Sequence, residues 1–347
     1  MISIIIPIHN TKIEDLEDCV KSISNQTYDN FEVLFIENGS QKEYIEAVDR
    51  IAKWDERFYV FHLGNVGVSS ARNFGTQQSK GDYIMYVDGD DLLAVDALED
   101  GINLIEKTDS DVVIGKILKT TERPQNLTNS LNNGYTMLDS ISKIRSFKRH
   151  ILTKNVAEWK LEQGFEYNGE GCWSHLIKRQ IALNNSFIPG VEVGEDTIWA
   201  LNMLDEKKPP KICLSEKLWY YYIQNEYSVL SKYNERIVEQ LTKPVSILSP
   251  VFLNESDDLY NAYMRWIMSK LKQIIFRYYL AKENKNSFKN KKHLMKKMIS
   301  SEPWAETIKD KRSLPFSMRL KLFLYRKNLM LTLFVIKNPQ IIFDQYN

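Results

Sequence analysis

Two hydrophobic periods alternate along the first 120 residues. Continuous apolar runs of strand length occupy residues 2–8, 31–39, 58–64, 82–91 and 111–118. Runs rich in β-branched residues are typical of strands that are buried on both faces of a parallel sheet. Between these runs lie segments with apolar residues at helical spacing: 14–24, 44–54, 69–79 and 94–106. This alternation predicts βαβ units and a mostly parallel sheet.

The pattern changes after residue 120. Residues 120–150 are polar and rich in Asn, Thr and Ser, which predicts a loop or lid with a short helix. Residues 158–225 return to mixed structure, and the chain beyond about residue 235 is expected to be entirely helical. At about 150 residues per domain, a chain of this length predicts two domains. We place them at 1–230 and 231–347.

Polar residues gather where the predicted strands end. The first strand is followed by His9 and Asn10, the second contains Glu37 near its end, and the fourth ends in Asp88-Gly89-Asp90-Asp91. Ligands of parallel sheets bind outside the carboxyl ends of the strands. The strand ends are therefore the predicted site.

Three carboxylates within four residues repel one another. A divalent cation removes that cost, and oxygen ligands suit Mg²⁺ or Mn²⁺. The alternative is that these residues cap the next helix, with Asp91 as the cap. Both interpretations remain open from these residues alone.

Two further segments are ambiguous by themselves. In residues 65–75, Gly67 allows a tight turn, and Ser69 or Ser70 could cap a helix that carries Arg72 in its first turn. An arginine there opposes the helix dipole, which favours an ion pair with a nearby acid. Glu195 and Asp196 begin another predicted helix, where acids in the first turn are ordinary.

The order and spacing of these segments resemble family 2 glycosyltransferases over roughly residues 1–230. The matching stretches are SIIIPIHN, NQTYDNFEVLFIENGS, NVGVSSARNFG and KGDYIMYVDGDD. The resemblance implies a GT-A fold, which is a Rossmann-like α/β/α sandwich. It also implies a nucleotide-sugar half at about 1–115, an acceptor half at about 116–230, a UDP-linked sugar donor, and Mn²⁺ or Mg²⁺ as cofactor.

The same resemblance implies roles for individual residues. His9 stands where the family usually has Tyr, and Glu37 stands for the Asp that contacts uracil or ribose. Asp88 and Asp90 match the metal-binding DxD pair, and Asp91 is a companion that either contacts the sugar or caps the helix. The residues that match the nucleotide-sugar pocket are Pro7, His9, Asn10, Glu37, Asn65, Arg72, Asp88 and Asp91.

The second half supplies the expected catalytic and acceptor groups. Glu195-Asp196 resembles the family's ED motif, in which the Asp is the base that takes the proton of the acceptor hydroxyl. Trp173 is expected either to stack on an acceptor sugar or to lie in the core. The late segment 219–228 has Ile223 for the usual Arg and Asn225 for the usual His, so the third metal ligand stays open.

Charge and cysteines add partners and compartment. The net charge of +1 divides into −13 for residues 1–263 and +14 for residues 264–347. Three separated cysteines without CxxC spacing, together with a start that does not resemble a secretory signal, favour a cytoplasmic location. The basic tail suits the anionic inner face of the plasma membrane. Packing on the catalytic domain or a homo-oligomer interface is the alternative, and nucleic acid is disfavoured.

The longest charge-free run of the tail, residues 328–336, is much shorter than the roughly 20 residues that span a bilayer. The resulting hypothesis is an inverting, metal-dependent glycosyltransferase that moves a hexosyl or N-acetylhexosaminyl group from a UDP-sugar to a hydroxyl of a glycan or lipid-linked acceptor. The alternative is a catalytically degenerate relative that binds sugar or membrane. A nucleotidyltransferase would need a Gly-rich loop after the first strand, and PIHNTKIEDL is a poor match.

Overall fold

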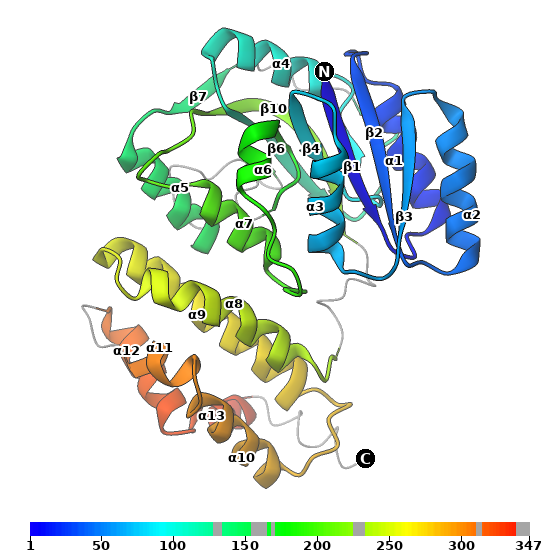
Figure 1. The fold of residues 1–347 in the computed structure, drawn as a ribbon. Coiled ribbons are helices and arrows are strands. Elements are labelled where there is room, and N and C mark those ends of the chain that lie inside the picture. Colours follow the sequence, from blue (N-terminus) through cyan, green and yellow to red (C-terminus); the bar gives the residue numbers. More distant parts are fainter. Residues whose placement is uncertain (128–133, 154–164, 168–170, 225–232, 310–313, 338–347) are drawn as a thin grey trace. The chain divides into compact units, whose positions relative to one another are not determined.

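The chain forms two compact units. The computed structural model describes residues 1–127, 134–153, 165–167, 171–224, 233–309 and 314–337. Unit 1 comprises residues 1–225 and unit 2 residues 226–347 (Figure 1). The division falls five residues before the boundary placed by the sequence analysis, and each unit has its own hydrophobic interior.

Unit 1 is built on one mixed sheet. Its described strands run in the order β3-β2-β1-β4-β9-β6-β10-β5, with β7 paired to β10 and β8 to β6. Strands β3, β2, β1 and β4 are mutually parallel, as are β6 and β10, whereas β5, β7, β8 and β9 pair antiparallel to their neighbours. The bounds are β1 Ile2–Ile8, β2 Phe31–Asn38, β3 Phe58–Leu63, β4 Tyr83–Tyr86, β5 Leu92–Leu93, β6 Val112–Thr120, β7 Tyr135–Leu138, β8 Phe165–Tyr167, β9 His175–Lys178 and β10 Ile212–Ile223.

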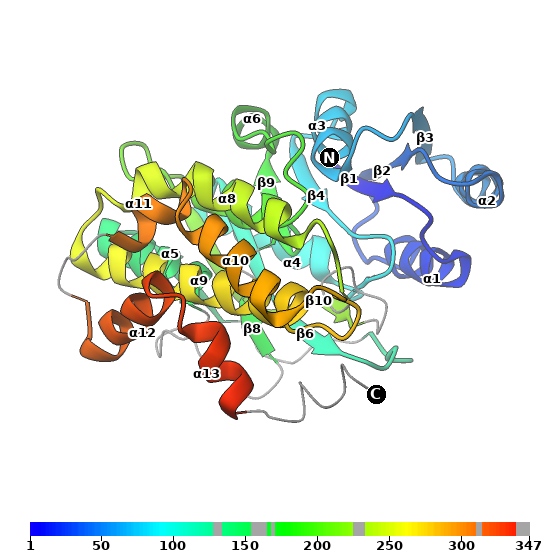
Figure 2. The same ribbon diagram turned by 90° about the horizontal axis from the view of Figure 1, so that it is seen from below.

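Helices cover both faces of this sheet. The described helices are α1 Ile13–Ser24, α2 Lys42–Ile51, the 3₁₀ turn Ala52–Trp54, α3 Val68–Gln78, α4 Ala97–Thr108, α5 Ile141–Thr153, α6 Arg179–Asn184 and α7 Glu195–Met203. Figure 2 shows α3 and α6 on one side of β1 and β4, and α1 on the other.

Side-chain alternation along β1 explains the two layers. The even-numbered isoleucines of β1 share a core cluster with the apolar faces of α1, α2 and α4. Ile5 points to the opposite face, where α3 approaches so closely that a Cβ on Gly75 would lie 2.5 Å from Ile5 Cγ2. The predicted α/β class with covered parallel strands is confirmed.

Residues 120–150 contain the predicted helix and, in place of a loop or lid alone, also a strand. Where the structure describes them, they contain strand β7 and the 13-residue helix α5. The polar composition misled because β7 has only four residues and pairs with β10, far away in the sequence. One face of helix α5 is buried and carries Ile144, Phe147 and Ile151.

The regular elements described in unit 2 are all helices, as predicted. Its elements are α8 Ile237–Phe252, α9 Asp257–Ile274, a π-helical turn Ile275–Tyr279, α10 Phe288–Ile299, α11 Trp304–Lys309, α12 Phe316–Arg326 and α13 Met330–Lys337. A buried hydroxyl cluster joins α8, α9 and α11, since Ser249 Oγ lies 2.7 Å from both Tyr263 Oη and Thr307 Oγ1. Among the described helices, none combines the length and the hydropathy that a membrane span needs.

Candidate active site

The acidic segment after β4 is held by the last strand of unit 1. The N–H of Asp91 donates to the carbonyl oxygen of Asp88 at 3.1 Å, which closes a tight turn. Asp91 is buried, with Oδ1 accepting from the Ile223 N–H at 2.7 Å and Oδ2 from the Tyr220 hydroxyl at 2.8 Å. The Asp88 N–H in turn donates to the Tyr220 hydroxyl oxygen at 3.1 Å. Strand β10 therefore fixes the turn.

Burial and the charges of Asp90 and Asp88 raise the pKa of Asp91 well above its ordinary value, against the opposing hydrogen bonds from Ile223 and Tyr220. The capping alternative for Asp91 is wrong, because α4 begins after Asp96. With both carboxylate oxygens bound to β10, Asp91 serves to position the turn.

Arg72 joins the acidic turn to the ED segment. Its Nη2 lies 2.9 Å from Asp88 Oδ1, and its Nη1 lies 3.2 Å from Glu195 Oε1. The guanidinium is buried and lies over the Phe187 ring, 5.3 Å from its centroid. Burial disfavours its charge, but Cys172 and the carboxylates of Asp88 and Glu195 together outweigh burial and raise the pKa of Arg72 well above its ordinary value. The guanidinium of Arg72 therefore links its own segment to both the acidic turn after β4 and the ED segment.

Local backbone structure places these groups. Helix α3 begins at Val68 after Gly67, whose φ of 83° favours glycine, so neither Ser69 nor Ser70 is the N-cap. Helix α7 likewise begins after Gly194, with φ 82°. Asp196 is half-buried in the first turn of α7, and its Oδ1 accepts from the Thr197 N–H at 2.7 Å. A negative charge at this position is favoured by the helix dipole.

The ends of β1 and β2 form a second polar group. Asn10, which follows β1 with φ 50°, has its N–H directed at Ser40 Oγ at 3.0 Å and accepts from the Gln41 N–H at 2.8 Å. The His9 Nδ1–H donates to the Asn38 carbonyl oxygen at 2.9 Å. These bonds tie the loop after β1 to the loop after β2.

Glu37 is buried beneath this loop pair. Its Oε1 accepts from the Ser40 N–H at 2.5 Å, and its Oε2 lies 3.5 Å from His62 Nδ1 on β3. Asn65 is exposed after β3 and packs against Gly39 so closely that a Cβ on Gly39 would meet the Asn65 backbone. Pro7 lies in β1 itself and is half-buried. The residues expected to line the nucleotide therefore share one edge of the sheet.

Trp173 is half-buried and belongs to an aromatic group. Its ring centroid lies 5.5 Å from that of Tyr222 and 6.1 Å from that of Tyr220. It packs against the core cluster, as the core alternative predicts, and stacking on an acceptor sugar stays a prediction. Asn225, the expected counterpart of the third metal ligand, lies outside the described residues.

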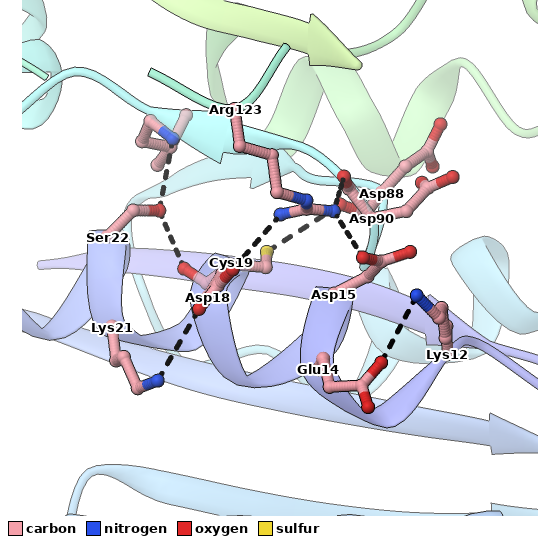
Figure 3. Close-up of polar contacts among 11 residues, drawn as sticks. Lys12, Glu14, Asp15, Asp18, Cys19, Lys21, Ser22, Asp88, Asp90 and Arg123 are labelled. Atoms are coloured by element: carbon pink, nitrogen blue, oxygen red, sulfur yellow. Dashed lines mark hydrogen bonds and ion pairs between the residues drawn. The ribbon is translucent and has the colours of Figure 1, made fainter. Parts of the chain in front are cut away.

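Arg123 is a site residue that no motif indicated. It follows β6, and Figure 3 shows its guanidinium between α1 and the acidic turn, while the carboxylates of Asp88 and Asp90 point away from it. Its Nη2 donates to the Asp90 carbonyl oxygen at 3.0 Å and pairs with Asp15 Oδ1 at 2.8 Å. Its Nη1 lies 3.7 Å from Asp18 Oδ2. The only sequence signal was the acid pair of α1 at helical spacing.

The carboxylates of Asp88 and Asp90 have the chemistry that a divalent cation needs. Asp88 and Asp90 are both half-buried carboxylates, and such oxygen ligands suit Mn²⁺ or Mg²⁺. Within the described ranges, no group of three or more His, Cys, Asp or Glu side chains is arranged to hold a metal. The pair therefore fits a cation whose remaining ligands come from substrate or water.

The chain is similar in sequence to known glycosyltransferases. Residues 3–161 match the family described as Glycosyl transferase family 2. The chain is 35% identical over 161 residues to Glycosyltransferase GlyG of Streptococcus pneumoniae serotype 4, covering 46% of this chain and 52% of that protein. It is 26% identical over 223 residues to the minor teichoic acid biosynthesis protein GgaB of Bacillus subtilis, covering 63% and 22%. The chain thus spans about half or less of these relatives.

A solved structure is similar in fold. Residues 1–349 of S. aureus TarS, in complex with UDP-GlcNAc, superpose with a TM-score of 0.65 at 16% identity, covering 94% of this chain and 88% of that one. At this identity the likeness concerns the fold. The family match covers residues 3–161, a little under half of the chain, and this part of the chain resembles glycosyl transferase family 2.

Proposed function

We propose that the protein is a metal-dependent, inverting glycosyltransferase that uses a UDP-sugar donor. The observation that carries the proposal is the Arg72 bridge, with 2.9 Å to Asp88 and 3.2 Å to Glu195. The buried Arg72 side chain contacts both the DxD turn and the ED segment, although these two segments lie 107 residues apart in the chain. A fold without a catalytic role would not require these two acidic motifs to converge.

The donor half is supported by the shared strand edge. Pro7, His9, Asn10, Glu37 and Asn65 are proposed to hold the nucleoside. The proposal that the base is uracil draws on the TarS structure, which holds UDP-GlcNAc at similar fold but low identity. The transferred group is proposed to be a hexosyl or N-acetylhexosaminyl unit.

Asp88 and Asp90 would hold Mn²⁺ or Mg²⁺ next to the diphosphate. When bound, such a cation supplies positive charge that offsets the charge of the leaving diphosphate. Arg72 limits the motion of Asp88 through its short ion pair, and Asp91 and Tyr220 limit the motion of the turn. Preorganised groups of this kind need not rearrange as charge develops.

Asp196 is proposed to act as the base. The acceptor hydroxyl oxygen attacks the anomeric carbon, its proton passes to the Asp196 carboxylate, and the bond from the anomeric carbon to the diphosphate oxygen breaks to release UDP. Attack from the face opposite the diphosphate inverts the anomeric configuration. Glu195, held by Arg72, positions the first turn of α7 and thereby its neighbour Asp196.

The acceptor side is proposed to lie in the second half of unit 1, with Trp173 offering an aromatic face to a sugar. A glycan or lipid-linked oligosaccharide of bacterial surface polysaccharide or glycoconjugate synthesis is the proposed acceptor, which agrees with the name of the GgaB relative. The enzyme would then work in the cytoplasm, at the inner face of the plasma membrane, with unit 2 on anionic lipid. A homo-oligomer through unit 2 is the alternative role of that unit.

Calorimetric titration of UDP, GDP and CDP, with and without Mn²⁺, tests the donor and the metal together. We expect micromolar binding of UDP that needs Mn²⁺ and falls at least tenfold in Asp90→Ala, since one of two carboxylate ligands is lost. Asp29→Ala removes an exposed aspartate elsewhere in unit 1 and should bind as the wild type does.

Turnover separates the base from the binding groups. Asp196→Asn should keep UDP and Mn²⁺ affinity and lose transfer to an acceptor by a factor of at least about 100, the usual size of general base catalysis. Retained transfer would remove Asp196 as the base. Failure of every nucleotide to bind would instead favour the degenerate, sugar-binding or membrane-binding relative.

A further inference from the structure

Helix α12 is amphipathic in an unusual way, because it carries two apolar faces. Met318, Leu322 and Tyr325 are buried within unit 2. Phe316, Leu320 and Phe323 are instead 72%, 46% and 46% exposed. Both sets follow the i, i+4, i+7 spacing of one helix face. The inner face accounts for the packing of α12, and the outer one needs a separate explanation.

The outer apolar residues form a narrow ridge. At 3.6 residues per turn, their directions fall within roughly 60° of one another and lie opposite the buried face. We call Phe316, Leu320 and Phe323 the α12 ridge. Exposed apolar residues that are scattered singly need no explanation, but aligned ones in a monomer usually mark a binding surface.

Cations flank the α12 ridge on both sides. Arg319 and Arg326 lie along one side and Lys321 along the other, and all three are exposed. Lys327 follows directly, with its Nζ 6.0 Å from the centroid of the Phe323 ring. Residues 316–327 contain no acid, and residues 264–347 carry a net charge of +14.

The remainder of the basic tail is less available. Leu331 of α13 is buried, and the Phe334 ring packs edge-on against Phe276 with centroids 4.9 Å apart. Lys291, within the cationic stretch of α10, is buried as well. Among the described residues of the tail, α10 and α13 therefore do not present a continuous apolar and basic surface, whereas the outer face of α12 does.

We propose that the α12 ridge and its flanking cations dock the protein on an anionic phospholipid surface. An apolar ridge between cations matches an interface with acyl chains below and phosphate headgroups around. Two copies of this face would instead bring like charges together. This inference rests on the proposed function in one respect: it names the surface of unit 2 that would contact the membrane. It does not depend on catalysis.

Vesicle co-sedimentation of the full chain tests the proposal. Vesicles of phosphatidylcholine with and without phosphatidylglycerol serve as probes, and UDP binding is measured in the same preparations. Wild type should bind the anionic vesicles only. Phe316→Ser/Leu320→Ser/Phe323→Ser should weaken that binding at least tenfold, and Arg319→Gln/Arg326→Gln about thirtyfold, at about 1 kcal/mol per cation.

Matched controls use the same unit. Val251→Ser changes an apolar residue of α8 that is 54% exposed, and Lys289→Gln/Lys296→Gln removes two exposed cations of α10. Both should retain wild-type vesicle binding. Equal loss in the charge control would mean that net charge, and not α12, is responsible, and the proposal would fall.

Two other results would also overturn it: wild type that binds no vesicle, or a wild-type dimer that the ridge variant converts to a monomer in sedimentation velocity. Because UDP binding is followed throughout, loss of vesicle binding with intact UDP binding removes only the docking surface. If the wild-type protein does not bind UDP, the result contradicts the proposed donor and leaves the docking surface untouched.

Discussion

Single residues in this protein gain their roles from distant partners. Arg72, judged on its own in the sequence, favours an ion pair, and that ion pair exists. The sequence could not tell that a second partner, Glu195, lies 123 residues further along the chain. The role of Tyr220 is unpredictable for the same reason, since a tyrosine in an apolar strand gives no sign that its hydroxyl will bind an aspartate 129 residues earlier.

His175 is a single residue whose burial affects the stability of unit 1. It is fully buried in β9, with its Nδ1–H donating to the Trp173 carbonyl oxygen at 2.8 Å. Its Nε2 has no hydrogen-bond partner among the described residues. Burial lowers the pKa of His175 to about 4. Protonation would therefore place an uncompensated charge beside Trp199 in the core.

We expect His175 to make unit 1 sensitive to acid. The unfolded chain binds a proton near pH 6.5 and the folded chain only near pH 4, so stability is complete above 6.5 and falls as the pH drops between these values. The loss should approach about 3 kcal/mol. Denaturant unfolding at pH 7, 5.5 and 4.5 measures it.

His175→Gln provides the comparison, because its side chain does not titrate. The difference in unfolding free energy between the variant and the wild type should shift in favour of the variant as the pH falls. A difference that stays constant from pH 7 to 4.5 would show that His175 is not the source of the acid sensitivity.

At the scale of elements, the segment after β6 holds the acidic turn in place. Arg123 reaches from it to α1 and to the backbone of the acidic turn, as Figure 3 shows. A backbone hydrogen bond from the Val95 N–H to the Leu127 carbonyl oxygen, 3.0 Å long, fastens the same segment beyond the turn. The turn is thus held from β10 on one side and from this segment on the other.

Arg123→Met should therefore weaken Mn²⁺-dependent UDP binding roughly tenfold, because a charge-assisted hydrogen bond to the Asp90 carbonyl is lost. Arg123→Lys should restore part of it. Calorimetric titration with thermal unfolding of the same samples distinguishes a loosened turn from a destabilised fold.

Arg57 offers a matched control for this experiment. Its side chain is 27% exposed against 25% for Arg123, and it pairs with Asp55 before β3, where the pKa of Asp55 is lowered by that hydrogen bond. Arg57→Met should cost stability and leave UDP affinity unchanged. If both variants lose UDP affinity equally, Arg123 has no specific role in holding the acidic turn.

The elements were predictable where the pattern was long and local. Strands β1, β2, β3 and β6 and helices α1, α2, α3 and α4 follow the hydrophobic periods to within a few residues. Strand β5 has two residues and β7 has four, and both exist only because β10 offers a pairing edge. Pairing between residues that lie 74 or more positions apart leaves no local periodicity, so these two strands could not be predicted in the same way.

At the scale of the whole molecule, the near-neutral chain consists of two units of opposite charge. Residues 1–225 carry 24 basic and 34 acidic residues, a net charge of −10, and residues 226–347 carry 22 and 11, a net charge of +11. The overall isoelectric point near 7.6 therefore describes neither unit. The acidic unit contains the candidate active site, and the basic unit contains the α12 ridge.

Ligand binding should stabilise the two units unequally. At 100 times the dissociation constant, UDP with Mn²⁺ should add about 2.7 kcal/mol to the folding free energy of the unit that binds it. Hydrogen exchange should then slow in α3 and α7 and remain unchanged in α9. Equal slowing in both units would mean that they unfold as one cooperative body.

The contacts of Tyr220 and Ile223 also bear on how the protein is made. The acidic turn is synthesised at residues 88–91, but the groups that fix it arrive 132 residues later, with the last strand of unit 1. Domains fold as units while they emerge from the ribosome, starting from the N-terminus. A nascent chain that has not yet released β10 can form βαβ units and remains without an ordered acidic turn. The candidate active site is therefore expected to acquire its ordered geometry only when the synthesis of unit 1 is complete.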